Sequence, residues 1–440
     1  MEWLSLASII VSLALLIFLA LRGFSIIIIA PVASLVVILM NGMPILESLQ
    51  DNYMSGFINF AKNNYLIFLF SAMFGKFMED SGAARKIAES LLKLTKKISG
   101  KKSKYGVLVS VVIITAVLTY GGVNVFVVIF AVMPIAKPLF REMDIPWHLF
   151  MGAFFFGMAT FSMTMLPGTP SIQNIIPTNY LGTTTTAAPL LGIVGSIIII
   201  IINLFYLKYA LVKTEKRGET YFNMKNPDGT SGDVDQYEGK KLPPLLLSIT
   251  PPLFLLIVLN IVKLEVVYTL MLTVILSSIV FWKYIDKKLS TVNVGATNTV
   301  LPIVNTSADV GYGTVIAATA GFGLVTEMMA NMPGSPFISL YLATTILAGI
   351  TGSASGGLGI SMETLMDTYT KLNLDPEVIH RIAVMASGGL DSLPHNGAVI
   401  TALAVVGLTH KDAYKHIFAT TVVAPIITAI PVLILAVLLY

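Results

Sequence analysis

Long apolar stretches recur along the chain from one end to the other, and this feature limits its fold more than any other. The first two, Leu4–Leu21 and Phe24–Met40, each approach the roughly 20 residues with which an α-helix crosses a hydrocarbon layer of about 30 Å. The 440-residue chain is 55% hydrophobic and only 12% charged, well below the charge content of an average soluble domain. We therefore expect an all-α polytopic membrane protein in the lipid bilayer.

The composition disfavours several kinds of chemistry. The chain has no cysteine, which excludes disulfides, cysteine-ligated metals and thiol catalysis, and we expect no cofactor. No G-x-x-x-x-G-K-[ST] motif is present, which disfavours ATP-driven transport. A net charge of +4 gives no reason to expect a nucleic-acid partner. Because no basic segment precedes Leu4–Leu21, we expect a retained membrane helix there and not a cleaved signal peptide.

Basic residues predict the orientation in the membrane. The densest basic run lies between Arg85 and Lys104, and more basic residues follow at Lys137 and in the polar segment 208–242. Such residues favour the cytoplasmic side. The segment from Lys104 to Lys137 therefore starts and ends on one side, although it contains two apolar arms of about 14 residues, each too short to cross comfortably. We expect a re-entrant hairpin over about 105–140.

Motifs repeat across the polar segment 208–242, which is the predicted cytoplasmic linker. "TYGGVN" precedes "DIPWH" and "LPGTPSI" in the first half, and "TGSASGG" precedes "DPEVIH" and "LPHNGAV" in the second. We expect two repeats, 1–207 and 243–440, with five crossings each, so that an odd number inverts the second repeat. This arrangement predicts about ten transmembrane helices, with both termini outside the plasma membrane.

Each predicted repeat contains one hairpin and one broken span. The first has three spans, the hairpin, a broken span and a final span; the second has a matching hairpin and a matching broken span. Their predicted bounds are 145–180 for the first broken span, 188–207 for the span that closes the first repeat, about 336–371 for the second hairpin and 378–408 for the second broken span.

The hairpin tips and the two breaks, "LPGTPS" and "LPHNG", amount to four irregular segments at membrane depth. Unsatisfied backbone groups cost several kcal/mol each in hydrocarbon, so these segments are expected to meet around one polar cavity. Helix N-termini that point into it favour a carboxylate. No lysine or arginine is placed within a span, so we expect helix dipoles and amides to hold the anion, unless His380 or Arg381 turns inward.

Polar side chains at the tips and breaks are the candidates for hydrogen bonds to a hydroxylated acid. They are Thr119, Asn124, Thr169, Ser171, Asn174, Thr351, Ser353, Ser355, Asn396 and Thr401. The alternative for each residue is that it caps a helix or bonds its own backbone.

Ionisable residues within predicted spans are candidates for proton coupling. Asp391 and His395 lie at the second break, and the alternative is a fixed hydrogen-bonded pair that steadies it. Glu327, in the predicted span Ala317–Met332, and Glu363, on the second hairpin, are further candidates. Asp309, in "NTSADVGYG", fits either an interfacial or a functional role.

The segments "NTSADVGYGTVIAATAGFG", "TGSASGGLGISMETL" and "SGGLDSLPHNGAVITAL" resemble the gluconate permease family, which is part of the ion transporter superfamily. The resemblance implies proton-coupled uptake of a small carboxylate by a homodimer, in which a scaffold domain holds a moving transport domain. It also implies substrate contacts from Gly121, Gly122, Asn124, Thr169, Ser171, Ser353, Ser355, His395 and Asn396.

The leading hypothesis is therefore a carboxylate:proton symporter. A sodium-coupled symporter is the nearest alternative, because carbonyl groups at the Gly-rich tips could supply oxygen ligands. An intramembrane hydrolase using Ser392, His395 and Asp391 has the required residue types, but their closeness in sequence argues against triad geometry. A channel is disfavoured, because paired hairpins suit occlusion better than an open pore.

Overall fold

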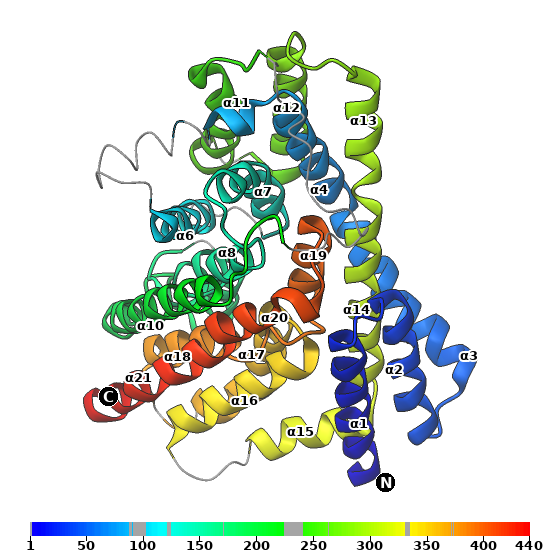
Figure 1. The fold of residues 1–440 in the computed structure, drawn as a ribbon. Helices are drawn as coiled ribbons and strands as arrows, with labels where there is room; N and C mark the ends of the chain where they lie inside the picture. Colours follow the sequence, from blue (N-terminus) through cyan, green and yellow to red (C-terminus); the bar gives the residue numbers. More distant parts are fainter. Residues whose placement is uncertain are drawn as a thin grey trace.

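The computed structural model describes residues 2–87, 90, 103–120, 125–169, 171–223, 241–262, 264–330, 335–370, 372 and 374–440. These residues form helices and turns without a β-strand (Figure 1). The elements of the first half are α1 (Glu2–Leu21), α2 (Ile26–Met40), α3 (Ile45–Glu47), the π-helical η1 (Ser48–Tyr53), α4 (Met54–Asp80), α6 (Lys104–Tyr120), α7 (Val125–Glu142), α8 (Leu149–Ala159), η2 (Phe161–Met165), α9 (Ile172–Leu181) and α10 (Pro189–Lys216).

The second half follows a similar order. Its elements are α11 (Leu245–Ile257), η3 (Val258–Val262), α12 (Val266–Phe281), α13 (Lys288–Thr297), α14 (Val300–Ala317), α15 (Ala320–Ala330), α16 (Pro336–Thr351), α17 (Ala354–Thr370), α18 (Pro376–Ser387), α19 (Gly397–Val406), α20 (His410–Phe418), η4 (Ala419–Val423) and α21 (Ala424–Leu439). Both halves thus contain two opening helices, a longer helical stretch, a helix pair, an interrupted helix and a closing helix.

Three helices are long and apolar enough to cross a membrane within the described ranges: Glu2–Leu21, Pro189–Lys216 and the joined helices His410–Leu439. Further apolar helices are shorter, such as α2 and α12 with 15 and 16 residues. Large apolar side chains point outward from these helices, including Phe205 of α10 and Ile279 of α12, which are 72% and 70% exposed. This surface is that of a polytopic membrane protein.

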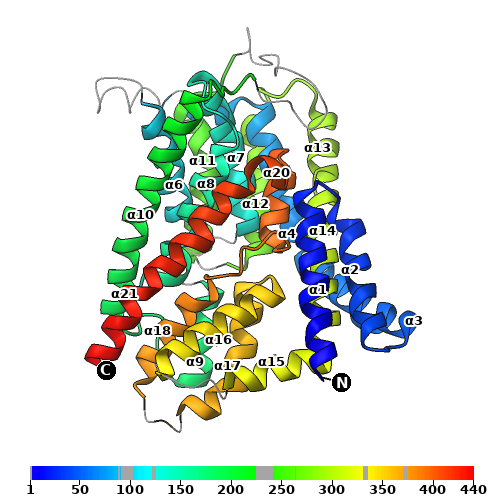
Figure 2. The same ribbon diagram turned by 60° about the horizontal axis from the view of Figure 1, so that its bottom comes forward.

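Buried apolar side chains form two separate cores. One lies mainly in α4, α6, α7, α8, α12 and α20, and we call it the linker-end core. The other lies mainly in α1, α2, α16, α17, α18 and α21, and we call it the terminus-end core. Figure 2 shows both chain termini at the lower end of the molecule, and the helix ends that flank residues 224–240 at the upper end. The hairpin helices α6 and α7 lie toward the upper end, and α16 and α17 toward the lower.

A layer of buried polar side chains separates the two cores. On α10, Asn203 lies between Ile199 of the terminus-end core and Leu207 of the linker-end core. The polar layer comprises Thr160, Ser162, Thr164, Asn203, Asn305, Thr306, Ser307, Thr420 and Thr421, all of them buried. Helical geometry changes at this layer, because the π-helical segments η2 and η4 both fall within it. Such distortions free backbone groups in the middle of the protein.

Hydrogen bonds to carbonyl groups satisfy many side chains of this layer. Asn203 Nδ2 donates to the Thr420 carbonyl at 3.1 Å and so ties α10 to η4. The hydroxyl groups of Thr160 and Ser162 donate to the carbonyls of Phe156 and Gly157, both at 2.6 Å. The polar layer therefore contains the helix distortions that expose backbone carbonyls and the side chains that donate hydrogen bonds to those carbonyls.

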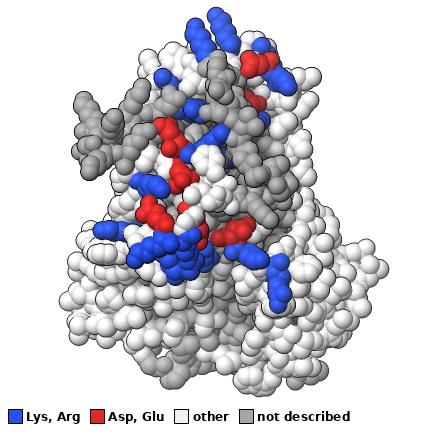
Figure 3. Space-filling view, in the orientation of Figure 1, with Lys and Arg blue, Asp and Glu red and all other residues white. Residues whose placement is uncertain are grey.

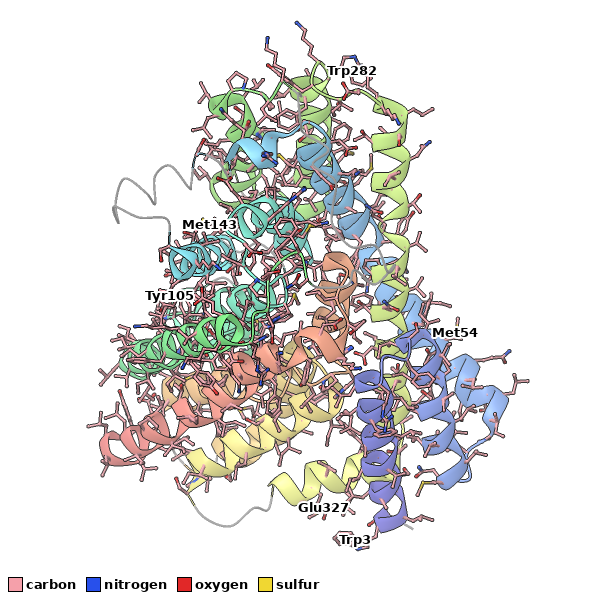
Figure 4. All side chains as sticks on the ribbon, viewed as in Figure 1. Trp3, Met54, Tyr105, Met143, Trp282 and Glu327 are labelled. Atoms are coloured by element: carbon pink, nitrogen blue, oxygen red, sulfur yellow. The ribbon has the colours of Figure 1, made fainter. Side chains whose placement is uncertain are left out.

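Charged side chains on the face shown in Figure 3 gather at its centre and top, and a broad uncharged surface surrounds them below and at the sides. Trp282 lies at the upper end of the molecule and Trp3 at the lower end (Figure 4). A broad uncharged surface is expected of a chain that sits in a bilayer.

Four side chains near the linker end, two of them buried and two partly buried, form a hydrogen-bonded chain. His148 Nε2 bonds Glu219 Oε2 at 2.8 Å, and His148 Nδ1 shares a 2.8 Å hydrogen bond with His416 Nε2. His416 Nδ1 in turn shares a 2.9 Å hydrogen bond with the Tyr206 hydroxyl. This chain joins the start of α8 to α10, to α20 and to the segment after α10.

The span predicted over Ala317–Met332 has a different form in the structure. α14 ends at Ala317, and the chain turns at Ala318 and Thr319 before the 11-residue α15 begins. α13 and α14 instead follow each other closely from Lys288 to Ala317. The polar run "NTSAD", which resembled an approach to a span, therefore lies inside a helix. Apolar residues flank this run on both sides, and this pattern was the signal in the sequence for one continuous helix.

The helices α16 and α17 pack closely at a glycine. A Cβ atom on Gly357 would lie 2.3 Å from the backbone N and Cα of Ala348 on the facing helix. Gly359, two residues further on α17, has no atom within 4 Å of its Cβ position. The pair offers a matched comparison on one helix.

We predict that Gly357→Ala destabilises the protein by about 1–3 kcal/mol, because the new methyl group forces α16 and α17 apart. Gly359→Ala should leave stability unchanged or raise it slightly, since alanine favours a helix. The thermal unfolding midpoints of the purified variants in detergent measure both effects. Equal midpoints for the two variants would contradict this packing.

Candidate functional site

The second break lies between the end of α18 at Ser387 and the start of α19 at Gly397. Asn396 caps α19, because its Oδ1 accepts a 2.8 Å hydrogen bond from the Val399 backbone N–H. Its Nδ2 donates to the Gly352 carbonyl at 2.8 Å. Gly352 has a φ of 59° and forms the turn between α16 and α17. The tip of the second hairpin is thus bonded to the second break.

The first break is connected to its own hairpin in a similar way. Tyr120, the last residue of α6, donates a 3.1 Å hydrogen bond from its hydroxyl to the Pro167 carbonyl. Ser171 caps α9 by accepting from Asn174 N–H, and its hydroxyl donates to the Met163 carbonyl at 2.7 Å. Each helix pair therefore touches the broken helix of its own half.

The second break also touches the first broken helix, at the turn of η2 just before the first break. A Cβ atom on Gly388, immediately after α18, would lie 3.2 Å from both Cγ2 and Oγ1 of Thr164 in η2. α14 approaches from another side, because the Thr306 hydroxyl donates to the Gly397 carbonyl at 3.2 Å and shares a short hydrogen bond with Thr401. Both breaks, the second tip and α14 consequently meet in one region of the polar layer.

Several buried polar atoms in and around this region have no hydrogen-bond partner among the described residues. The side chains concerned include Thr119, Thr169, Asn305, Ser307, Asp309 and His395. His395 is 1% exposed, and neither of its ring nitrogens makes a hydrogen bond of good geometry, although the ring lies against Gly352 and close to the backbone of Gly349 and Ile350. Because buried polar groups in folded proteins are nearly always paired, a bound polar molecule or water is the natural partner for these atoms.

Other predicted site residues are bonded within the fold. The Thr351 hydroxyl donates to the Leu347 carbonyl at 2.8 Å. Ser353 accepts from Gly356 N–H at 3.1 Å and shares a 3.4 Å hydrogen bond with Ser355. These residues fit the alternative in which hydroxyl groups cap helices, but they still line the turn that Asn396 contacts. The predicted tip residues Gly121, Gly122 and Asn124 lie outside the described residues.

The four predicted coupling residues do not lie together. Glu327 is exposed on α15 at the lower end of the molecule (Figure 4), and Glu363 is exposed on α17. Asp391 and His395 are both buried at the second break. Their side chains do not bond each other, which overturns the fixed pair considered from the sequence; Asp391 Oδ1 instead accepts from Ser392 Oγ at 3.1 Å.

The same contacts bear on the hydrolase hypothesis. A hydrolytic triad needs a hydrogen bond from the serine hydroxyl to the histidine. Ser392 donates to Asp391, and no hydrogen bond joins Ser392 to His395. Tyr414 and His410 of α20 hold this loop, through hydrogen bonds to the carbonyls of Ser392 and Pro394 at 3.1 Å and 2.6 Å. The arrangement lacks triad geometry.

The exception named from the sequence applies, because Arg381 and His380 turn inward. Arg381 of α18 is fully buried, with 0% exposure. Its guanidinium donates to the carbonyls of Ala187 and Thr185, both at 3.0 Å, and to Asn174 Oδ1 at 3.1 Å. His380 bonds the same Asn174 oxygen at 3.1 Å. Both side chains hold the segment between α9 and α10, so they have a buried structural role.

A cavity of about 250 Å³ lies between α4, α7, α19 and the junction of α13 with α14. Its lining includes Lys76, Glu79, Phe130, Asn298 and Pro302. Lys76 Nζ pairs with Glu79 at 3.1 Å and with Asp80 at 2.9 Å. No predicted site residue lines the cavity, which lies beside the linker-end part of α19, whereas the break lies at the opposite end of that helix.

Apolar helices that surround interrupted, polar segments are the arrangement of a polytopic membrane protein. A family model described as GntP family permease matches residues 4–276. A relative named "Uncharacterized transporter YxjC", from Bacillus subtilis (strain 168), is 36% identical over 461 residues, and the match covers 94% of this chain and 95% of the relative. The chain belongs to the GntP permease family, which confirms the resemblance carried by its motifs.

Gly352 offers a test of the contact between the second tip and the second break. A left-handed backbone costs an alanine about 1–3 kcal/mol of stability. We predict that Gly352→Ala loses more stability than this, because a Cβ atom there would lie 2.6 Å from the His395 ring. Gly182→Ala is the matched control, since Gly182 has a φ of 64° and open space around its Cβ position. Thermal unfolding midpoints in detergent compare the two. An equal loss in both variants would show that His395 is not held against the tip.

Proposed function

We propose that the protein is a secondary active transporter that carries a small organic carboxylate of the gluconate or hydroxy-acid class together with protons. The observation that supports this most is the set of unpartnered buried polar atoms where the two breaks meet. The helices α9 and α19 begin at these breaks, and the N-terminus of a helix favours negative charge. Hydroxyl and amide groups beside them suit a hydroxylated acid.

We further propose that the two halves are inverted repeats and that the pairs α6–α7 and α16–α17 are re-entrant hairpins. The recurring order of elements and the position of the two pairs toward opposite ends of the molecule support this (Figure 2). Under this proposal 208–242 is cytoplasmic and both termini face outward from the plasma membrane. Symmetry of this kind lets one site be exposed alternately to each side.

An elevator-type cycle is the proposed mechanism. The broken helices and hairpins would move as one body, because each hairpin bonds its own break and the second break touches the first broken helix. The contact of α14 with α19, through Thr306, would then be broken and remade in each cycle. The family resemblance also favours a homodimer, in which the remaining helices form the fixed scaffold.

Proton coupling requires a group that changes charge during the cycle. Asp391 and His395 are the proposed carriers, since they are the two predicted coupling residues buried at the second break. Sodium coupling is the alternative, supported by the Gly352 carbonyl at the tip and by the unpartnered Asn305 and Asp309 oxygens nearby.

Uptake by proteoliposomes tests the function directly. Labelled gluconate, lactate, 3-hydroxybutyrate and citrate are offered under an inward proton gradient, an inward sodium gradient, or neither. We predict accumulation of at least one acid under the proton gradient alone, because the proposed carriers bind protons. Accumulation that follows only sodium would support the alternative coupling. No accumulation of any carboxylate under either gradient would contradict the proposal.

Asn396→Asp tests the place of the substrate. The new carboxylate can still cap α19, but it loses the donor to Gly352 and puts negative charge where a substrate carboxylate would bind. We predict at least a tenfold loss of substrate affinity, or about 1.4 kcal/mol. Asn64→Asp is the control, because Asn64 bonds its own helix on α4, at the Phe60 carbonyl. Isothermal titration with the transported acid gives both affinities, and unchanged binding by Asn396→Asp would remove Asn396 from the site.

A further inference from the structure

Asp309 of α14 is a buried carboxyl group without a partner. It is 4% exposed, and no hydrogen bond or ion pair to its side chain occurs within the described part of the chain. The other buried carboxyl group among the described residues, Asp391, accepts a hydrogen bond from Ser392. Removing an ionised carboxylate from water without a partner is among the most costly events in a protein interior. The group therefore requires a bound cation or a proton.

The surroundings of Asp309 place it against the second break. Asp309 Oδ2 would lie 3.8 Å from a Cβ atom on Gly397, the first residue of α19. Thr306, three residues earlier on α14, bonds the Gly397 carbonyl, so that one face of α14 packs on the start of α19. Asn305, four residues earlier, adds a second unpartnered oxygen.

The other groups that face Asp309 are hydroxyl-bearing aromatic rings. Tyr53 of η1 and Tyr312 of α14 itself lie near its carboxyl group. The Tyr312 hydroxyl shares a 2.9 Å hydrogen bond with Ser12 of α1, and Tyr53 packs on Gly311. α19 contributes backbone N–H groups at its N-terminus, whose dipole offers only partial compensation to an anion. No arginine, lysine or histidine forms an ion pair with Asp309 in the described structure, so nothing there substitutes for the missing counter-charge.

We propose that Asp309 is a further proton-binding residue of the transport cycle, which rests on the proposed function. A proton suits the site better than a metal ion, because one O–H bond neutralises the carboxylate, whereas a sodium ion needs several oxygen ligands at once. Asp309 lies on α14, and the residue that it faces lies on a broken helix that would move. Movement of α19 changes the electrostatic field at the Asp309 carboxyl group. This links protonation of Asp309 to the position of the moving broken helices and hairpins.

Infrared spectroscopy of the purified protein reads the Asp309 proton without any transport. A protonated carboxyl group absorbs separately from amides and carboxylates. We expect such absorption in the wild-type protein and the loss of one component of it in Asp309→Asn, while any component from the buried Asp391 remains. Asp51→Asn, which removes an exposed carboxylate of η1 by the same chemical change, should lose no component. Absorption that Asp309→Asn leaves unchanged in full, or no such absorption in the wild type at low pH, would overturn the proposal whether or not the variant is stable.

Transport by the same variants completes the test. Asp309→Asn should reduce accumulation driven by the proton gradient at least tenfold and preserve exchange of internal for external substrate, because the amide mimics the protonated acid permanently. Asp51→Asn should transport as the wild type does. Full accumulation by Asp309→Asn would overturn the role of Asp309 in coupling. If the wild type itself carries no acid, the proposed function fails, and the infrared band still shows whether Asp309 binds a proton.

Discussion

The fold depends on one constraint: polar backbone and side-chain groups buried in a membrane protein must find partners inside the protein. The chain meets this constraint by dividing its apolar side chains into two cores and placing polar groups between them. Helices that run through the polar layer are interrupted or widened there, as at η2, η4 and the break before Gly397. Where such groups lack partners among the described residues, the proposed substrate or water would supply them.

The contacts around that layer connect architecture with function. Tyr120 joins the first hairpin to the first break, Asn396 joins the second hairpin to the second break, and Thr164 lies against Gly388 where the breaks meet. Two hairpins and two broken helices that are bonded in this way can move as a unit, while α14 supplies a separate surface against α19. Membership of the GntP permease family agrees with this arrangement, and the proposed carboxylate transport gives a reason for it.

Much of the fold could be predicted from the sequence, because apolar length and the position of Gly and Pro are local signals. The helix interruptions at "LPGTPS" and "LPHNG" are examples. The site was less predictable, since hydrogen-bond partners come from distant parts of the chain. Arg381 is tolerated in the protein interior because carbonyls near position 187 satisfy it, and Asp309 faces Gly397, almost ninety residues later. Neither contact has a signature in the nearby sequence.

The absence of cysteine from the chain permits a direct test of the central claim, that a substrate carboxylate binds where the second tip meets the breaks. Single cysteines at Ser355, half-buried on the second tip, and at Asn179, exposed on α9, are labelled with a thiol reagent in the presence and absence of the transported acid. The account predicts that the acid slows labelling at position 355 and leaves position 179 unchanged. Equal labelling rates at position 355 with and without the acid would contradict it.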